Sequence, residues 1–125
     1  MKLAVSESKR LGEIQQMFER KYPFLKLELY KVLDAEIQVK KILGPETVLK
    51  NVAAQRDGFD IEDKMSVQEL SQLFMKHFGL RAIVFRKAGI IWLETTLTAD
   101  WSLRKQNDQG KEITNPVRKK SEDQS

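Results

Sequence analysis

The stretch that decides the fold reads LGEIQQMFERKY at residues 11–22, and it recurs as VQELSQLFMKHF at residues 67–78. The two passages align without a gap at a constant offset of 56 residues. One residue drops out behind them, and LKLELYK at 25–31 then aligns on LRAIVFR at 80–86. A solenoid needs at least three repeats. Two copies therefore predict a single domain built from a duplicated unit.

Each of the matched passages carries one apolar stripe with helical spacing. The stripes consist of Leu11, Ile14, Met17, Phe18 and Tyr22 in the first copy, and of Val67, Leu70, Leu73, Phe74 and Phe78 in the second. We expect helices over residues 9–21 and 66–78. Pro23 ends the first helix and Gly79 the second, while Ser66 begins the second with a capping box.

A strand follows each helix. In residues 25–30 leucines alternate with polar residues, which predicts one buried face. Residues 80–85 are apolar on both faces apart from Arg81, which favours a more central position in the sheet. Each strand is expected to fold back as a hairpin, into residues 36–40 and 90–94 respectively.

The repeat extends in both directions. Leu3 and Val5 align on Phe59 and Ile61, so a short strand precedes each helix. Short helices closed by glycine are expected at residues 49–58 and 103–110, followed by strands at 59–61 and 111–113.

These expectations define an α+β fold from a duplicated β-α-β-β-(short α)-β unit, spanning about 1–58 and 57–114. The sheet is predicted to be mixed, with the two main helices packed on one face. The domain covers residues 1–115, and the polar residues 116–125 are expected to form a disordered tail.

Composition excludes several function classes. The chain of 125 residues has no cysteine, which rules out disulfides and zinc-thiolate sites. It shows no signal peptide and no stretch of about 18 apolar residues, so we expect a cytoplasmic protein without a membrane partner. The net charge of +4 comes from 22 basic and 18 acidic residues interleaved along the chain, which is typical of a solvated surface rather than a duplex-binding face.

The second half carries five motifs that identify a resemblance. They are Phe78-Gly79-Leu80, Val84-Phe85-Arg86-Lys87, Trp92-Leu93-Glu94-Thr95-Thr96, Asp100-Trp101-Ser102-Leu103 and Gln106-Asn107-Asp108-Gln109-Gly110. Residues 65–114 thereby resemble a small uncharacterised bacterial α+β family, which has threonine at the position of Ser102. The resemblance implies no known activity. The order of elements is also similar to the back half of a ubiquitin-like β-grasp fold.

No constellation for catalysis, a cofactor or a metal emerges from the sequence. His77 is the only histidine, near the end of a helix, where the helix dipole favours a cation. The glycines form no phosphate-binding loop. Glu62 and Asp63 precede a helix, where negative charge is stabilising without any acid–base role.

The segment from Trp92 to Trp101 is the one place that suggests a site. It gathers two indoles, three threonine hydroxyls and two carboxylates in ten residues, a combination suited to partner recognition. The interaction residues expected from it are Trp101, Asp100, Thr96, Thr98 and Glu94. A purely structural interpretation holds Trp92 in the core beside Ile90 and makes Asp100 a helix N-cap.

Three functions are compatible with these features. The leading hypothesis is a non-catalytic protein-interaction module that uses this segment or the free edge of a hairpin. The first alternative is a nucleic-acid-associated protein that uses surface cations such as Lys9, Arg10, Arg20 and Lys21. The second is a small enzyme or ligand binder around Glu94, Asp100 and His77, which requires a deep pocket joining them.

Overall fold

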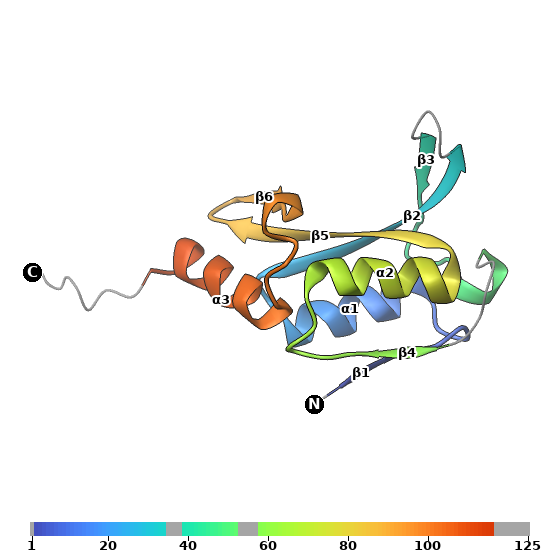
Figure 1. The fold of residues 1–125 in the computed structure, drawn as a ribbon, viewed down its shortest axis with the longest axis horizontal. Helices are drawn as coiled ribbons and strands as arrows, with labels where there is room; N and C mark the ends of the chain where they lie inside the picture. The colour runs from blue at the N-terminus through green and yellow to red at the C-terminus, as the bar shows by residue number, and fades with distance from the viewer. Residues whose placement is uncertain (1, 35–38, 53–57, 117–125) are drawn as a thin grey trace, which may run out of the picture.

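The computed structural model describes residues 2–34, 39–52 and 58–116. Over these residues the chain forms, in order, β1 (Leu3–Val5), α1 (Leu11–Lys21), β2 (Leu25–Asp34), β3 (Val39–Ile42), the 3-10 turn η1 (Leu49–Asn51), β4 (Phe59–Ile61), α2 (Val67–Phe78), β5 (Leu80–Ala88), β6 (Ile91–Glu94), the 3-10 turn η2 (Thr96–Thr98) and α3 (Leu103–Thr114) (Figure 1). The fold is a single α+β domain, as predicted. The predicted tail lies outside the described residues from position 117 onward.

The strands form two sheets. Four of them are ordered β3-β2-β5-β6, and β1 pairs with β4 in a separate ribbon. Every neighbouring pair is antiparallel, so the predicted mixed sheet is wrong. β3 and β6 each follow their partner strand closely in the chain, and a short connection joins only antiparallel strands. Residues 36–38 of the first predicted hairpin strand lie outside the described residues. β5 is an inner strand, between β2 and β6, but β2 is equally internal, between β3 and β5, so β5 is not the more central of the two as predicted.

Helices α1 and α2 lie between the two sheets, so both cover the same face of the four-stranded sheet (Figure 1). Leu3, Val5 and Ile61 point from the ribbon into this layer and are buried. The helices contribute buried apolar residues from the predicted stripes, although Met17 and Leu73 are only half-buried. No helix in the described part of the chain is long and apolar enough to cross a membrane.

The register of the sheets relates the two halves of the chain. Glu28 pairs with Ile83, and Ala4 pairs with Asp60. The sequence alignment makes the same residues equivalent, at offsets of 55 and 56. Equivalent residues meet in this way when two copies are related by a twofold axis. The register supports the predicted duplication, which stays a prediction.

A second pattern also occurs in both halves. In each half, the first amide of one helical segment donates to a carbonyl just before the other segment, and the reverse bond is also present. In the first half these bonds run from Leu11 to Thr47 and from Leu49 to Lys9. In the second half they run from Val67 to Trp101 and from Leu103 to Met65. Isolated antiparallel bridges accompany these bonds, between Arg10 and Val48 and between Ser66 and Ser102. The free amides of helix N-termini are thereby satisfied inside the protein.

The ends of α2 agree with the sequence prediction. The Ser66 hydroxyl accepts from the Glu69 amide at 3.0 Å, and the Glu69 carboxylate accepts from the Ser66 amide at 2.9 Å. Gly79 ends the helix in the left-handed conformation, with φ 68°. In α1, where Arg10 replaces the capping serine, only the half formed by Glu13 is present, at 2.8 Å.

The C-terminal part corrects three expectations. Helix α3 continues through Gly110 to Thr114, so neither the stop at Gly110 nor the strand at 111–113 exists. Gly110 is needed for packing, because an added Cβ would lie 2.9 Å from the Phe24 Cβ. The N-cap is Ser102, whose hydroxyl accepts from the Lys105 amide at 3.1 Å, and not Asp100. In the first half η1 covers only Leu49–Asn51, and residues 53–57 of the predicted helix lie outside the description.

Candidate functional site

The predicted interaction residues lie on the connection that leaves β6. Glu94 is the last residue of β6, Thr96 and Thr98 belong to η2, and Asp100 and Trp101 precede α3. The start of this connection ends the pairing of β5 with β6. The first residues of β5 are therefore left without a strand partner on the β6 side in the described part of the chain, and the candidate site lies beside them.

Thr95 stops the β5–β6 ladder. Its amide and hydroxyl both donate to the Val84 carbonyl, at 3.2 and 2.9 Å, and the residue is buried. The chain then turns away into η2. Since β6 pairs only with Phe85–Ala88, no strand among the described residues pairs with Leu80–Ile83 on this side of β5.

A groove of about 380 Å³ runs along this open edge, between β5 and α2. Helix α2, the start of β5 and the β6–η2 connection line it with the residues Val67, Gln68, Ser71, Gln72, Met75, Arg81, Ala82, Ile83, Val84, Glu94, Thr95, Thr96 and Ala99. Met75 lies on this groove with 45% of its surface exposed. The wall is mostly apolar, and the two charged side chains in its lining are those of Arg81 and Glu94.

The backbone of Ala82 faces the groove. Peptide groups along a strand alternate in direction, and the Val84 carbonyl points to the β6 side, so the N–H and C=O of Ala82 point the same way. The Ala82 carbonyl accepts from the Ser71 hydroxyl of α2 at 2.9 Å. This bond holds α2 against the strand and leaves the Ala82 amide directed into the row that β6 does not fill.

The structure divides the predicted interaction residues. Glu94 and Thr96 line the groove, and the Thr96 hydroxyl donates to the Glu94 carboxylate at 3.1 Å. Thr98 instead accepts the side-chain amide of the buried Gln106, through its carbonyl at 2.7 Å and its hydroxyl at 2.8 Å. Asp100 is exposed and does not line the groove. Trp101 is half-buried, with the Lys105 ammonium 4.3 Å from its ring centroid.

The expectation that Trp92 is a core residue is wrong. Ile90, its supposed neighbour in the core, lies in the hairpin turn and is 97% exposed. Trp92 is half-buried on the face of the sheet opposite the helices, where the Lys26 ammonium lies 5.3 Å from its ring centroid. Buried positions of β5 lie only on the helix side, because α1, α2 and α3 cover that side alone.

This outer face of the sheet is a second feature that the sequence analysis missed. It presents three half-buried aromatic rings among cationic side chains: Tyr30, Phe85 and Trp92 with Lys26, Arg81 and Lys87. Lys26 also lies 3.6 Å from the Glu28 carboxylate. The alternation of Lys26, Glu28 and Tyr30 indicated a wet face, but the sequence did not show that the rings of β5 and β6 join it.

Glu94, Asp100 and His77 do not meet in one pocket. Glu94 lines the groove, and Asp100 and His77 do not. His77 is half-buried beside Phe59, with ring centroids 5.2 Å apart. Within residues 2–34, 39–52 and 58–116, no three histidine or carboxylate side chains are placed to hold a metal ion.

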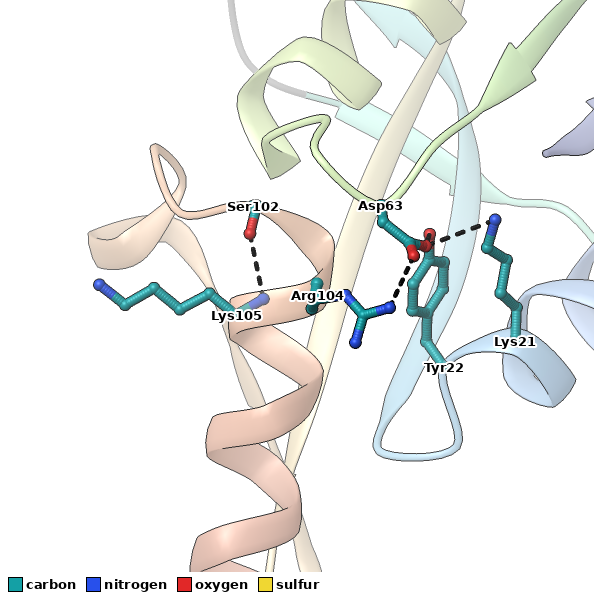
Figure 2. Close-up of polar contacts among 6 residues, drawn as sticks. All are labelled: Lys21, Tyr22, Asp63, Ser102, Arg104 and Lys105. Carbon is teal, nitrogen blue, oxygen red and sulfur yellow. Dashed lines mark hydrogen bonds and ion pairs between the residues drawn. The ribbon is translucent and has the colours of Figure 1, made fainter. Parts of the chain in front are cut away.

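Asp63 is the centre of a polar cluster (Figure 2). Its carboxylate accepts from the Tyr22 hydroxyl at 2.8 Å and from the Arg104 guanidinium at 3.0 Å, and lies 3.4 Å from the Lys21 ammonium. The Tyr22 hydrogen bond is the main cause that lowers the pKa of Asp63, and the cations add to it. Burial, and after it the same bond, raises the pKa of Tyr22. Because the cluster joins the end of α1 and the start of α3 to the connection that precedes α2, we assign it a structural role.

The cluster also changes the set of candidate cations for nucleic acid. Lys21, one of the four expected to bind phosphate, is engaged with Asp63. The sequence analysis attributes the negative charge of Asp63 to the helix that follows it. It does not identify the partners Tyr22 and Arg104, which are each 41 residues away in the chain.

The comparisons with known proteins add no family. No protein-family model matches the chain, and searches of curated proteins and of solved structures give no match. The resemblance of residues 65–114 to an uncharacterised bacterial family remains a prediction.

Proposed function

We propose that the protein is a non-catalytic protein-interaction module that binds a partner chain in the groove between α2 and β5. The observation that carries the proposal is the open edge at Leu80–Ile83 beside an apolar groove. An unpaired strand edge offers main-chain donors and acceptors to another chain, and pockets beside it supply specificity.

Exposed apolar residues near the groove support this proposal. Met75 is 45% exposed on its wall, and Leu97 of η2, next to Thr96, is 98% exposed. Large apolar side chains at a surface groove are typical of sites that bury against a partner. Glu94 and Thr96 would be polar contacts at one end, while Trp101 and Asp100 remain candidates outside the groove itself.

Substitution of Gln72 by tryptophan tests the proposal. Gln72 is exposed and lines the groove, so an indole there fills the groove without disturbing the core. The matched control is Gln16→Trp, at the aligned and equally exposed position of α1. We expect Gln72→Trp to lose partners captured from native lysate and Gln16→Trp to retain them. Equal capture by both variants would contradict the proposal.

The outer sheet face favours one alternative, binding of single-stranded nucleic acid. Aromatic rings interleaved with cations form stacking platforms for bases, and Trp92 lies beside Lys26 and Lys87 at 5.3 and 6.0 Å from its ring centroid. Titration with an unstructured oligonucleotide distinguishes the two functions. In a variant that lacks Trp101, quenching of Trp92 fluorescence that weakens steeply with salt supports the alternative, and an unchanged spectrum argues against it.

A further inference from the structure

The outer strand β6 has one free edge. Its other edge pairs with Phe85–Ala88 of β5, and no strand in the described part of the chain pairs with the free one. Ile91 and Leu93 are 54% and 43% exposed, and Ile90 in the adjoining turn is 97% exposed. Large apolar side chains gathered at a strand edge are typical of a surface that pairs with another chain.

The opposite edge of the same sheet differs in sequence. It is formed by β3, which reads VKKI and has lysines at positions 40 and 41. Lysine on an edge strand opposes pairing with another chain. β6 reads IWLE and has no cation. Of the two outer strands of this sheet, only β6 lacks this protection.

The pairing with β5 determines which main-chain groups of β6 reach the free edge. Thr95 donates its amide to the Val84 carbonyl of β5 at 3.2 Å. Main-chain groups alternate in direction along an antiparallel strand. The N–H and C=O groups of Trp92 and Glu94 therefore point to the free edge, where they can bond to a further strand.

The side chains of β6 alternate as well. Leu93 is opposite Arg86, whose guanidinium donates to the Gln106 side chain of α3 at 2.9 Å. Leu93 and Ile91 therefore lie on the helix side of the sheet, and Trp92 lies on the outer face. A strand added at this edge would cover the exposed parts of these side chains.

The sequence of β6 supplies the complement that its own edge requires. Opposed residues of neighbouring strands point to the same face, so the added strand needs apolar side chains two positions apart, opposite Ile91 and Leu93. The same two residues of a second copy have this spacing and belong to a strand that is already formed. Two antiparallel copies of one strand are related by a twofold axis, the commonest symmetry of protein dimers.

The side chains also select the register. With Trp92 on the axis, Ile91 is opposite Leu93 of the second copy, so both exposed apolar side chains are covered. A shift in one direction places Ile91 opposite Thr95, whose side chain is buried in its own copy. A shift in the other direction places Leu93 opposite Gly89, which has no side chain.

We infer that the free edge of β6 is a homodimer interface, in which β6 pairs antiparallel with β6 of a second copy around Trp92. The two Trp92 residues exchange both main-chain hydrogen bonds, and their rings form a cross-strand aromatic pair on the outer face. The ladder ends where Glu94 lies opposite Ile90 in the turn, so η2 lies beyond it. The two four-stranded sheets become one continuous sheet.

Sedimentation of the full chain between about 1 µM and about 1 mM tests the interface. We expect a reversible dimer with a Kd of about 10–500 µM, because strands of four residues bury less area than a standard interface. Ile91→Lys should raise the Kd at least about tenfold. The matched control is Ile42→Lys on β3, where the isoleucine is also 54% exposed; it should change the Kd less than about twofold.

The absence of native cysteine permits a direct test of the register. Under mild oxidation at a concentration above the Kd, Trp92→Cys should crosslink with itself. Its Cα atoms would be about 5.5 Å apart, within the reach of a disulfide. Ile91→Cys and Leu93→Cys should each stay uncrosslinked alone and form a disulfide when they are mixed.

The inference is independent of the proposed function, which partner capture by Gln72→Trp tests. A chain that stays monomeric at about 1 mM overturns the inference, as does equal weakening by Ile91→Lys and Ile42→Lys. Crosslinking of Leu93→Cys with itself, without crosslinking of the mixture, also overturns it. A dimer that Gln72→Trp dissolves would place the contact at the groove instead of β6, and this too overturns the inference.

Discussion

Replacement of Asp63 by alanine should destabilise the protein more than any other single loss of a surface carboxylate in the described chain. The change removes a carboxylate that accepts from the Tyr22 hydroxyl at 2.8 Å and from the Arg104 guanidinium at 3.0 Å. The same carboxylate lies 3.4 Å from the Lys21 ammonium. Tyr22 is buried, so its hydroxyl would be left without this acceptor. The contacts of the β4–α2 connection with α1 and with α3 would weaken together.

The magnitude can be worked from the exposure of each partner. The bond from buried Tyr22 to a charged acceptor contributes about 1.5–2 kcal/mol. Lys21, with a side chain 17% exposed, contributes about 0.5–1 kcal/mol, and Arg104, 67% exposed, at most about 0.5 kcal/mol. The sum is about 3 kcal/mol, or a fall of about 10 °C in Tm for a chain of this size.

Urea melts of a double-mutant cycle with Tyr22→Phe measure the principal contact. We expect a coupling energy of about 1 kcal/mol or more between Tyr22 and Asp63. The control is Glu62→Ala, which loses only a 3.8 Å pair between exposed side chains and should cost less than about 0.5 kcal/mol. An Asp63→Ala cost below about 1 kcal/mol, or a coupling below about 0.3 kcal/mol, would refute the reasoning.

Other predictions concern the core, α3, the outer face and pH. Phe18→Ala and Phe74→Ala should each cost about 3–5 kcal/mol in urea melts, because both rings are fully buried; a cost under about 1 kcal/mol would be inconsistent with burial. Gly110→Ala should destabilise by about 1–3 kcal/mol through its close contact with Phe24, although alanine in a helix normally stabilises by about 1 kcal/mol; a higher urea midpoint would contradict this packing. Trp92→Ala should keep a cooperative melt, and acrylamide should quench Trp92 in a variant that lacks Trp101; a shielded Trp92 would contradict its place on the outer face. Because the pKa of Asp63 is lowered in the folded state, its stabilisation is complete above the unfolded-state pKa of about 3.9 and is lost as pH falls through the folded-state value; Asp63→Asn should reduce this acid loss, and equal acid midpoints would argue against it.

Local signals predicted most of the fold because each was strong at its own position. The apolar stripe around Phe74, the Ser66 capping box and Gly79 all concern neighbours within one helix, and the structure contains all of them. Gly110 misled the prediction, because a glycine that ends a helix and one that allows close packing look alike in a sequence. Only the approach of Phe24, distant in the chain, distinguishes the two uses.

The candidate site was predictable only in part for a similar reason. The cluster of polar residues after Trp92 indicated a surface connection, and Glu94 and Thr96 do line the groove. The groove itself depends on where β6 stops pairing and on how α2 lies against Ala82. Neither relationship has a local sequence signal, since both join residues from separate elements.

The pairing of β2 with β5 has a consequence for synthesis on the ribosome. Leu25 of β2 is made 55 residues before Leu80 at the start of β5, the strand against which β2 pairs. At bacterial and eukaryotic elongation rates this interval is about 3–11 s. Throughout it, the nascent chain carries an amphipathic strand whose leucines lack the neighbours that β5 later supplies. Cells must keep this segment from associating with other chains until the second half emerges, so early termination after β3 should yield an aggregation-prone fragment rather than a stable half-domain.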